Sequence, residues 1–159
     1  MKKSLLLFLM PLFIGNKTSP PYQPTKIDPN PIKVKTVELE PKPIHKLVNA
    51  LIYVESKGND SAIGDRHLKV PSVGVLQIRP IMVREANRIL RIQGSNKRFT
   101  LKDRFNREKS IEIFMTWKNY HHPNSNFETI ARNWNGGPKG YKSSKTVNYW
   151  NKVKNKLNG

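Results

Sequence analysis

The pattern of residues 43–59 predicts an amphipathic helix whose apolar face ends in a carboxylate. Four apolar residues recur at helical spacing along it: Ile44, Leu47, Val48 and Leu51. Glu55 follows Leu51 by four residues and therefore falls on the same face. We expect desolvation and the negative end of the helix dipole to raise the pKa of Glu55. A carboxyl that keeps its proton near neutral pH suits a general acid. The alternative is a glutamate that covers the helix end and stays in water.

The remaining acidic residues of segment 43–159 have simpler explanations. They are Asp60, Asp65, Glu85, Asp103, Glu108, Glu112 and Glu128. Glu85 with Arg88 and Asp103 with Arg107 have the i,i+3 and i,i+4 spacing of exposed helix pairs. The other helical acids lie in a first turn or among basic residues, and the two remaining aspartates fall in a loop. Elimination therefore favours Glu55.

Other catalytic chemistries lack their residues. The chain has no cysteine, no serine in a GxSxG turn and no GxxxxGK[ST] phosphate loop. Its four histidines show no HExxH spacing. We predict no metal site and no cofactor.

The chain divides into three parts. Lys2 and Lys3 precede a ten-residue apolar run, which is too short for a span of about 20 residues and matches a secretory signal. We assign residues 1–15 to this segment, with an uncleaved anchor or a buried strand as alternatives. Residues 16–42 are a proline-rich linker. Residues 43–159 form the folded domain, and we expect a secreted, periplasmic or cell-envelope protein.

Helical patterns dominate the folded domain, which we expect to be mainly α with little β. Pro80 is placed to begin a helix that ends near residue 92. A capping box at Thr100 and Asp103 predicts a helix to about residue 120. A stripe at 127–134 predicts another, and Thr146 is placed to cap the last. Residues 72–78 form a short buried segment without helical pattern.

The net charge of +18 favours polyanionic partners. Segment 43–159 holds 22 basic and 8 acidic residues, so most of the excess belongs to the folded domain. Charge alone is compatible with nucleic acid, anionic lipid or an acidic cell-wall polymer.

Three blocks in order resemble the soluble lytic transglycosylase domain of the lysozyme-like superfamily, which includes goose-type lysozymes. They are VES at 54–56, GVLQI at 74–78 and NWNGGP at 133–138, and a weaker match surrounds Tyr149. The resemblance covers about residues 44–153. The WNGG sequence at 134–137, together with Pro80 after the glutamine block, is similar to phage-associated members of the family. The loop 57–71 departs from the family, as does Pro71-Ser72.

The resemblance implies a lysozyme-like helical fold and cleavage of the β-1,4 bond between N-acetylmuramic acid and N-acetylglucosamine in peptidoglycan. Glu55 would act first as acid and then as base, closing a 1,6-anhydro ring. Ser56, Gln77, Asn135 and Tyr149 would line the cleft and bind the glycan strand, with Ser56 orienting Glu55. The family needs no cofactor.

Two alternatives remain open. A hydrolytic muramidase would use water in place of the sugar 6-hydroxyl, with Asp60 or Asp65 positioning that water. A non-catalytic protein would bind the cell wall or nucleic acid through its basic surface. Nucleic acid is disfavoured because the basic residues are dispersed and follow a secretion signal. We also expect transient membrane contact through residues 1–15.

Overall fold

The computed structural model describes residues 43–159, so the expected signal segment 1–15 and linker 16–42 lie outside the described residues. Its elements are α1 (Pro43–Ser56), α2 (Pro80–Ile92), α3 (Arg107–His121), α4 (Phe127–Gly136) and α5 (Val147–Asn158), with 3₁₀ turns at Lys102–Phe105, Gly140–Lys142 and Ser144–Thr146. The described part has no strand, only two isolated bridges that tie Val73 to Ile63 and Ile78. The expected mainly helical class is confirmed. None of the described helices has the length and apolarity needed to cross a bilayer.

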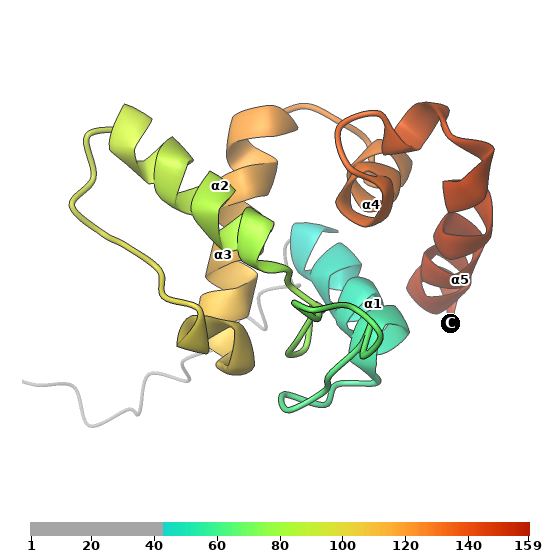
Figure 1. Ribbon diagram of the computed structural model, residues 1–159. Coiled ribbons are helices and arrows are strands. Elements are labelled where there is room, and N and C mark those ends of the chain that lie inside the picture. Colours follow the sequence, from blue (N-terminus) through green and yellow to red (C-terminus); the bar gives the residue numbers. More distant parts are fainter. Residues whose placement is uncertain (1–42) are drawn as a thin grey trace, which may run out of the picture. The chain divides into compact units, whose positions relative to one another are not determined.

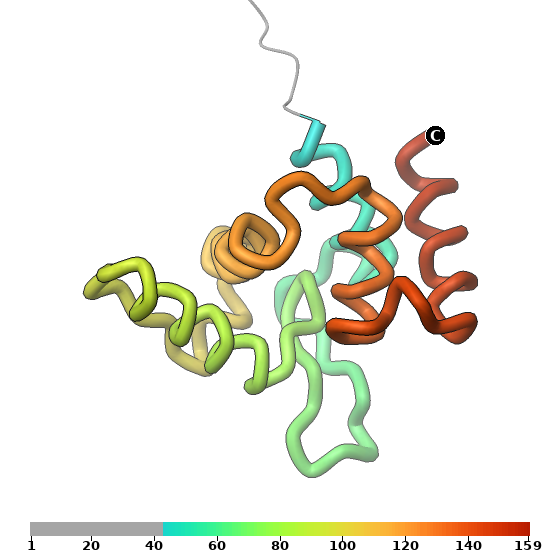
Figure 2. Tube along the Cα trace, turned by 90° about the horizontal axis from the view of Figure 1, so that it is seen from above, coloured from blue at the N-terminus to red at the C-terminus, as the bar shows by residue number. Residues whose placement is uncertain are grey.

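Helix α1 lies between two helix pairs. Figures 1 and 2 show α2 with α3 on one side of it and α4 with α5 on the other. Helix α5 packs against both α1 and α4, and α2 packs against α3. The loop that follows α1 projects away from the helices in Figure 2 before the chain returns to begin α2. The C-terminal end of α1 therefore lies between the loop that follows it and α5.

The core forms where apolar helix faces meet the turn at 73–78. Leu47 and Leu51 of the predicted α1 stripe are completely buried, and so are Phe114 of α3 and Val153 of α5. The ring of Phe114 lies edge-on to that of Trp134, with centroids 5.0 Å apart. Burial of these side chains supplies most of the stabilising free energy. It also ties the α1 end to α4 and α5.

One predicted helix start is wrong. The helix expected from Thr100 begins at Arg107, because Asn106 adopts an extended backbone and its side chain caps α3 by accepting from the Lys109 amide at 2.9 Å. Only half of the capping box forms: Asp103 accepts from the Thr100 amide at 2.6 Å, over a 3₁₀ turn. Arg107 consequently does not pair with Asp103.

The last helix does begin after Thr146, but this threonine makes no capping bond to it. Its hydroxyl instead donates to the carbonyl of Gly140 at 2.7 Å, in the preceding loop. The polar group that the sequence assigned to the helix start therefore stabilises the connection between α4 and α5.

The buried turn at 72–78 is confirmed and requires glycine at position 74. Gly74 has φ +76°, and a Cβ there would lie 1.7 Å from the carbonyl oxygen of Arg104. Arg104 is itself buried, and its guanidinium donates to the Ile78 carbonyl at 3.1 Å. The buried turn is thereby held against the 3₁₀ turn that precedes α3.

Candidate active site

Glu55 lies in the last turn of α1, where the apolar stripe meets a cavity. The Tyr149 hydroxyl of α5 donates to Glu55 Oε1 at 2.7 Å. These two residues are far apart in sequence, and the packing of α1 on α5 brings them together. Of the expected site residues, Tyr149 is thus the one in direct contact with the carboxyl.

Burial raises the pKa of Glu55 to about 7. The hydrogen bond from Tyr149 opposes this rise, because it stabilises the carboxylate form, whereas the negative charge of Asp65 adds to it. Burial and the neighbouring carboxylate also raise the pKa of Tyr149 well above its ordinary value, so the phenol remains a hydrogen-bond donor. At neutral pH a large fraction of Glu55 therefore carries a proton, as general acid catalysis requires.

The cavity beside Glu55 has a volume of about 560 Å³, within the range of small-ligand sites. Its walls come from the loop after α1, the 72–78 turn, the start of α2 and the end of α4. Trp134 supplies an aromatic wall, and Gln77 and Asn135 are the expected binding residues that line it. Asn135 is exposed, so its amide is available to a ligand.

Gln77 is held by the loop that it faces. Its amide nitrogen donates to the carbonyls of Gly74 at 2.9 Å and Ala62 at 3.3 Å. Its backbone adopts φ +46°, an uncommon conformation for a residue with a side chain. Gly64 leaves room for it, because a Cβ there would lie 2.1 Å from Gln77 Oε1. Gln77 therefore shapes the cavity wall, with its nitrogen already occupied.

Asp65 is the second carboxylate of the cavity. The Ser72 hydroxyl lies 3.0 Å from both Asp65 Oδ2 and Gln77 Oε1, so it connects the loop to the buried turn. The sequence did not distinguish Asp60 from Asp65 as the residue that would position a water molecule. Asp60 instead pairs with Arg107 of α3 at 2.9 Å and does not line the cavity.

Ser56 lies next to Glu55 but faces the turn. Its hydroxyl donates to the carbonyl of Val75 at 2.9 Å and lies 3.2 Å from that of Ile52. It makes no hydrogen bond to Glu55, and it is not among the residues that line the cavity. Its observed contacts join the end of α1 to the buried turn.

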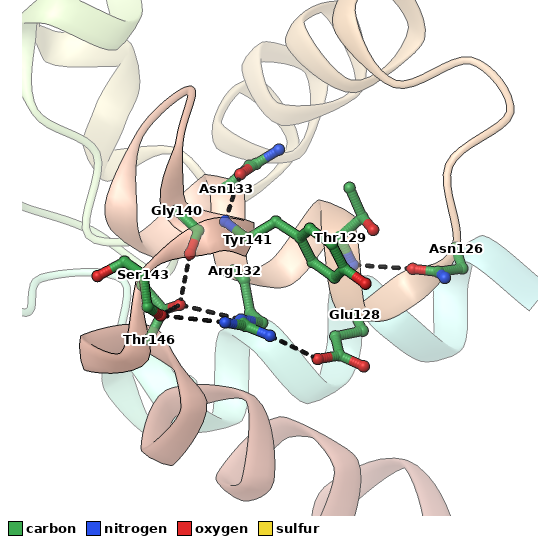
Figure 3. Close-up of polar contacts among 9 residues, drawn as sticks. All are labelled: Asn126, Glu128, Thr129, Arg132, Asn133, Gly140, Tyr141, Ser143 and Thr146. Atoms are coloured by element: carbon green, nitrogen blue, oxygen red, sulfur yellow. Dashed lines mark hydrogen bonds and ion pairs between the residues drawn. The ribbon is translucent and has the colours of Figure 1, made fainter.

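Arg132 of α4 organises the loop that leads to Tyr149. Figure 3 shows its guanidinium between Glu128 and the end of that loop. It donates to Glu128 Oε1 at 2.7 Å, to Thr146 Oγ1 at 3.0 Å and to the Ser143 carbonyl at 3.0 Å. Tyr149 follows Thr146 by three residues, so this network holds the start of α5 in place. The sequence pattern explained Glu128 only as an acid in a first helical turn and did not identify Arg132.

No cluster of three or more histidine and carboxylate side chains within residues 43–159 is arranged to hold a metal ion. The chemistry available to the cavity is therefore that of a protonated carboxyl, a phenol, amides and a second carboxylate. No protein-family model and no curated protein matches the chain.

Proposed function

We propose that this chain is a peptidoglycan lytic transglycosylase with a lysozyme-like fold. It cleaves the β-1,4 bond between N-acetylmuramic acid and N-acetylglucosamine and leaves a 1,6-anhydro end. The observation that carries this proposal is the protonated Glu55 beside an open cavity, with a pKa of about 7 and a phenol donor on one oxygen. The order of the three sequence blocks supports it, because their residues Glu55, Gln77 and Asn135 all line this cavity.

Glu55 serves twice in this reaction. Its carboxyl donates a proton to the glycosidic oxygen as the bond breaks. The acetamido group of the substrate stabilises the positive charge on the sugar, which is a known alternative to a second carboxylate. The Glu55 carboxylate then accepts the proton of the sugar 6-hydroxyl as that oxygen closes the anhydro ring. Tyr149 keeps one carboxyl oxygen fixed and leaves the other available.

A second candidate, a hydrolytic muramidase, is favoured by one specific observation. Asp65 lines the same cavity as Glu55 and is close enough for its charge to raise the Glu55 pKa. A carboxylate in this position could take a proton from a water molecule as it attacks the sugar. In that case the products would carry reducing ends.

The basic surface supports a cell-wall substrate. Stem peptides and wall polymers are acidic, and a net charge of +18 would concentrate the protein on them. Binding to isolated sacculi is expected to weaken as salt rises, because ions screen exposed charges. A cell-envelope location follows from this substrate and from the signal expected at residues 1–15, which lie outside the described part.

Digestion of purified sacculi, followed by mass spectrometry of the soluble products, tests the proposal. Anhydro-muropeptides from the wild type identify a transglycosylase, and reducing-end products identify the muramidase. Glu55→Gln is expected to release neither. Glu108→Gln is the matched control, since Glu108 is exposed on α3 and makes no ion pair with the described residues. Binding to sacculi without release of products by the wild type would identify a non-catalytic wall protein.

A further inference from the structure

The outer faces of α1 and α5 together carry four exposed lysines. Lys46 lies on α1, Lys57 directly follows it, and Lys152 and Lys156 lie one turn apart on α5. Lys46 is seven residues before Tyr53, which places both on one side of α1. Helix α5 packs against α1 and runs back alongside it in Figure 2. We call these four lysines, with Tyr53 among them, the lysine surface.

Tyr53 joins the two helices at the centre of the lysine surface. Its ring is exposed, and two ammonium groups lie close to it: Lys57 Nζ at 4.1 Å and Lys156 Nζ at 4.4 Å from the ring centroid. An aromatic ring attracts an ammonium group placed over its face. The ring therefore holds two positive charges from separate helices near each other. Because both side chains are already positioned, an anion that binds them loses less of its affinity to the ordering of flexible chains.

No carboxylate of the described residues neutralises this surface. Glu55 is the single acidic residue of α1, where it faces its own cavity, and α5 has none. The ion pairs of the described part involve Asp60, Glu85, Glu112 and Glu128, and none of them includes a lysine of this surface. None of its residues lines the Glu55 cavity either. The lysine surface thus offers its charge to a ligand outside the cavity.

The residue types favour phosphate over carboxylate. Helices α1 and α5 carry lysine and no arginine, whereas α2 carries Arg84, Arg88 and Arg91. The guanidinium fork matches the two oxygens of a carboxylate, while lysine binds as a point charge. A phosphodiester spreads its charge over oxygens that can accept from two neighbouring ammonium groups. Lysines on two helices therefore suit a chain of phosphates.

The same surface has little to offer a nucleic acid base or a bilayer. Bases bound without pairing stack on exposed aromatic rings. Tyr53 is the single exposed aromatic side chain of α1 and α5, and ammonium groups already lie against its ring. Insertion into a bilayer needs an apolar face, and Val147 is the single exposed large aliphatic side chain of these two helices. A phosphate polymer without bases is the partner that remains.

We propose that the lysine surface binds a polyol-phosphate polymer of the cell wall. The polymer crosses α1 and α5 at Tyr53, where one phosphate lies between Lys57 and Lys156, and neighbouring phosphates meet Lys152 and Lys46. Such contact holds the domain on the wall while the Glu55 cavity stays open. The placement of this polymer at the wall rests on the proposed function, whereas the binding itself requires no cleavage.

Fluorescence anisotropy of labelled poly(glycerol phosphate) with the full-length protein tests the proposal. The double variant Lys57→Gln, Lys156→Gln removes both ammonium groups at the Tyr53 ring and should weaken binding about tenfold at low salt. The slope of log affinity against log salt should become shallower by roughly 1.4, as for two lost phosphate contacts on a single strand. The double variant Lys69→Gln, Lys102→Gln makes the same change of net charge at exposed sites outside α1 and α5. We expect this control to bind nearly as the wild type does.

Tyr53→Leu separates a built surface from net charge. It leaves every lysine in place but removes the ring that holds two of them, so binding should weaken about threefold. Tyr53→Phe keeps the ring and is expected to bind as the wild type does. Unchanged affinity in Tyr53→Leu, or equal losses in the two double lysine variants, would overturn the proposal, because net charge alone would then explain the binding.

Three comparison ligands test the chemistry of the partner. They are oligothymidylate, polyglutamate and vesicles that contain phosphatidylglycerol, and we expect each to bind more weakly than poly(glycerol phosphate). Tighter binding of oligothymidylate would make the partner a nucleic acid, and tighter binding of the vesicles would make it a bilayer. Equal binding of polyglutamate would show that phosphate is not preferred. Each of these results would overturn the proposal.

Failure of this proposal is distinguishable from failure of the proposed reaction. Poly(glycerol phosphate) holds no glycosidic bond, so its binding does not depend on Glu55. Sacculi stripped of phosphate polymers should be cleaved equally by the wild type and by the double variant Lys57→Gln, Lys156→Gln, since neither lysine lines the cavity. A protein that cleaves these sacculi without binding the polymer refutes the lysine surface alone. One that binds the polymer without cleaving sacculi refutes the reaction alone.

Discussion

Replacing Glu55 by glutamine should make the protein more stable, and increasingly so as pH rises. The folded state raises the pKa of this carboxyl from its ordinary 4.5 to about 7. Between these values the folded protein keeps a proton that the unfolded chain has released. Stability therefore falls with rising pH over this window, since the unfolded state binds fewer protons. The stabilisation is present below pH 4.5 and is lost as pH passes 7.

The magnitude follows from the shift. One pKa unit corresponds to about 1.4 kcal/mol, so a rise from 4.5 to about 7 gives roughly 3 kcal/mol between pH 4 and pH 8. Glutamine keeps the acceptor for the Tyr149 hydroxyl and carries no charge, so Glu55→Gln lacks this dependence. We expect the variant and the wild type to have similar free energies of unfolding at pH 4, and the variant to be more stable by roughly 3 kcal/mol at pH 8.

Urea unfolding of both proteins at intervals from pH 4 to pH 8 measures this difference directly. The difference between the two proteins cancels the titration of all other groups. Glu108→Gln makes the same change of net charge at an exposed site, and its difference from the wild type should stay constant with pH. A Glu55→Gln difference that is also constant would refute the burial argument and, with it, the reason for expecting a protonated acid.

Three further variants test the surroundings of the carboxyl. Tyr149→Phe removes the bond that lowers the Glu55 pKa, so the alkaline limb of the pH–rate profile should move to higher pH; an unmoved limb would contradict the contact. Asp65→Asn removes a charge that raises the Glu55 pKa, so the alkaline limb should move to lower pH. If this variant lost the reducing-end products and kept the anhydro products, Asp65 would be assigned to the activation of water. Gly74→Ala places a Cβ 1.7 Å from the Arg104 carbonyl oxygen and should lower the free energy of unfolding by roughly 3 kcal/mol, measured with urea; a change under about 1 kcal/mol would argue against the close approach.

The apolar stripe of α1 made the position of the Glu55 carboxyl, at the edge of the core, predictable. Helical spacing from Leu47 to Glu55 is a local property, and the same spacing places the carboxyl at the edge of the core that the stripe enters. The helix starts at Pro80 and Phe127 were predictable for the same reason, because proline and asparagine act within one turn. The start of α3 was not, because a buried Arg104 and an extended Asn106 interrupt a pattern that otherwise continues.

Contacts between segments that are distant along the chain could not be predicted from the sequence. Nothing in the residues around Asp60 and Asp65 distinguishes them. Arg107, far along the chain, pairs with Asp60, while Ser72 holds Asp65 at the cavity. The contact of Asn133 was not predictable either, since its oxygen accepts from the Tyr141 amide, which lies beyond the end of α4. Such assignments depend on how loops close against helices, which local spacing does not determine.

The release of soluble muropeptides from purified sacculi tests most directly the central claim that Glu55 is the general acid of glycan cleavage. The account predicts release by the wild type near pH 6 and by Glu108→Gln at a similar rate. Release by Glu55→Gln should fall at least a hundredfold, in keeping with the loss of a general acid. Equal release by Glu55→Gln, or none by the wild type, would contradict the account.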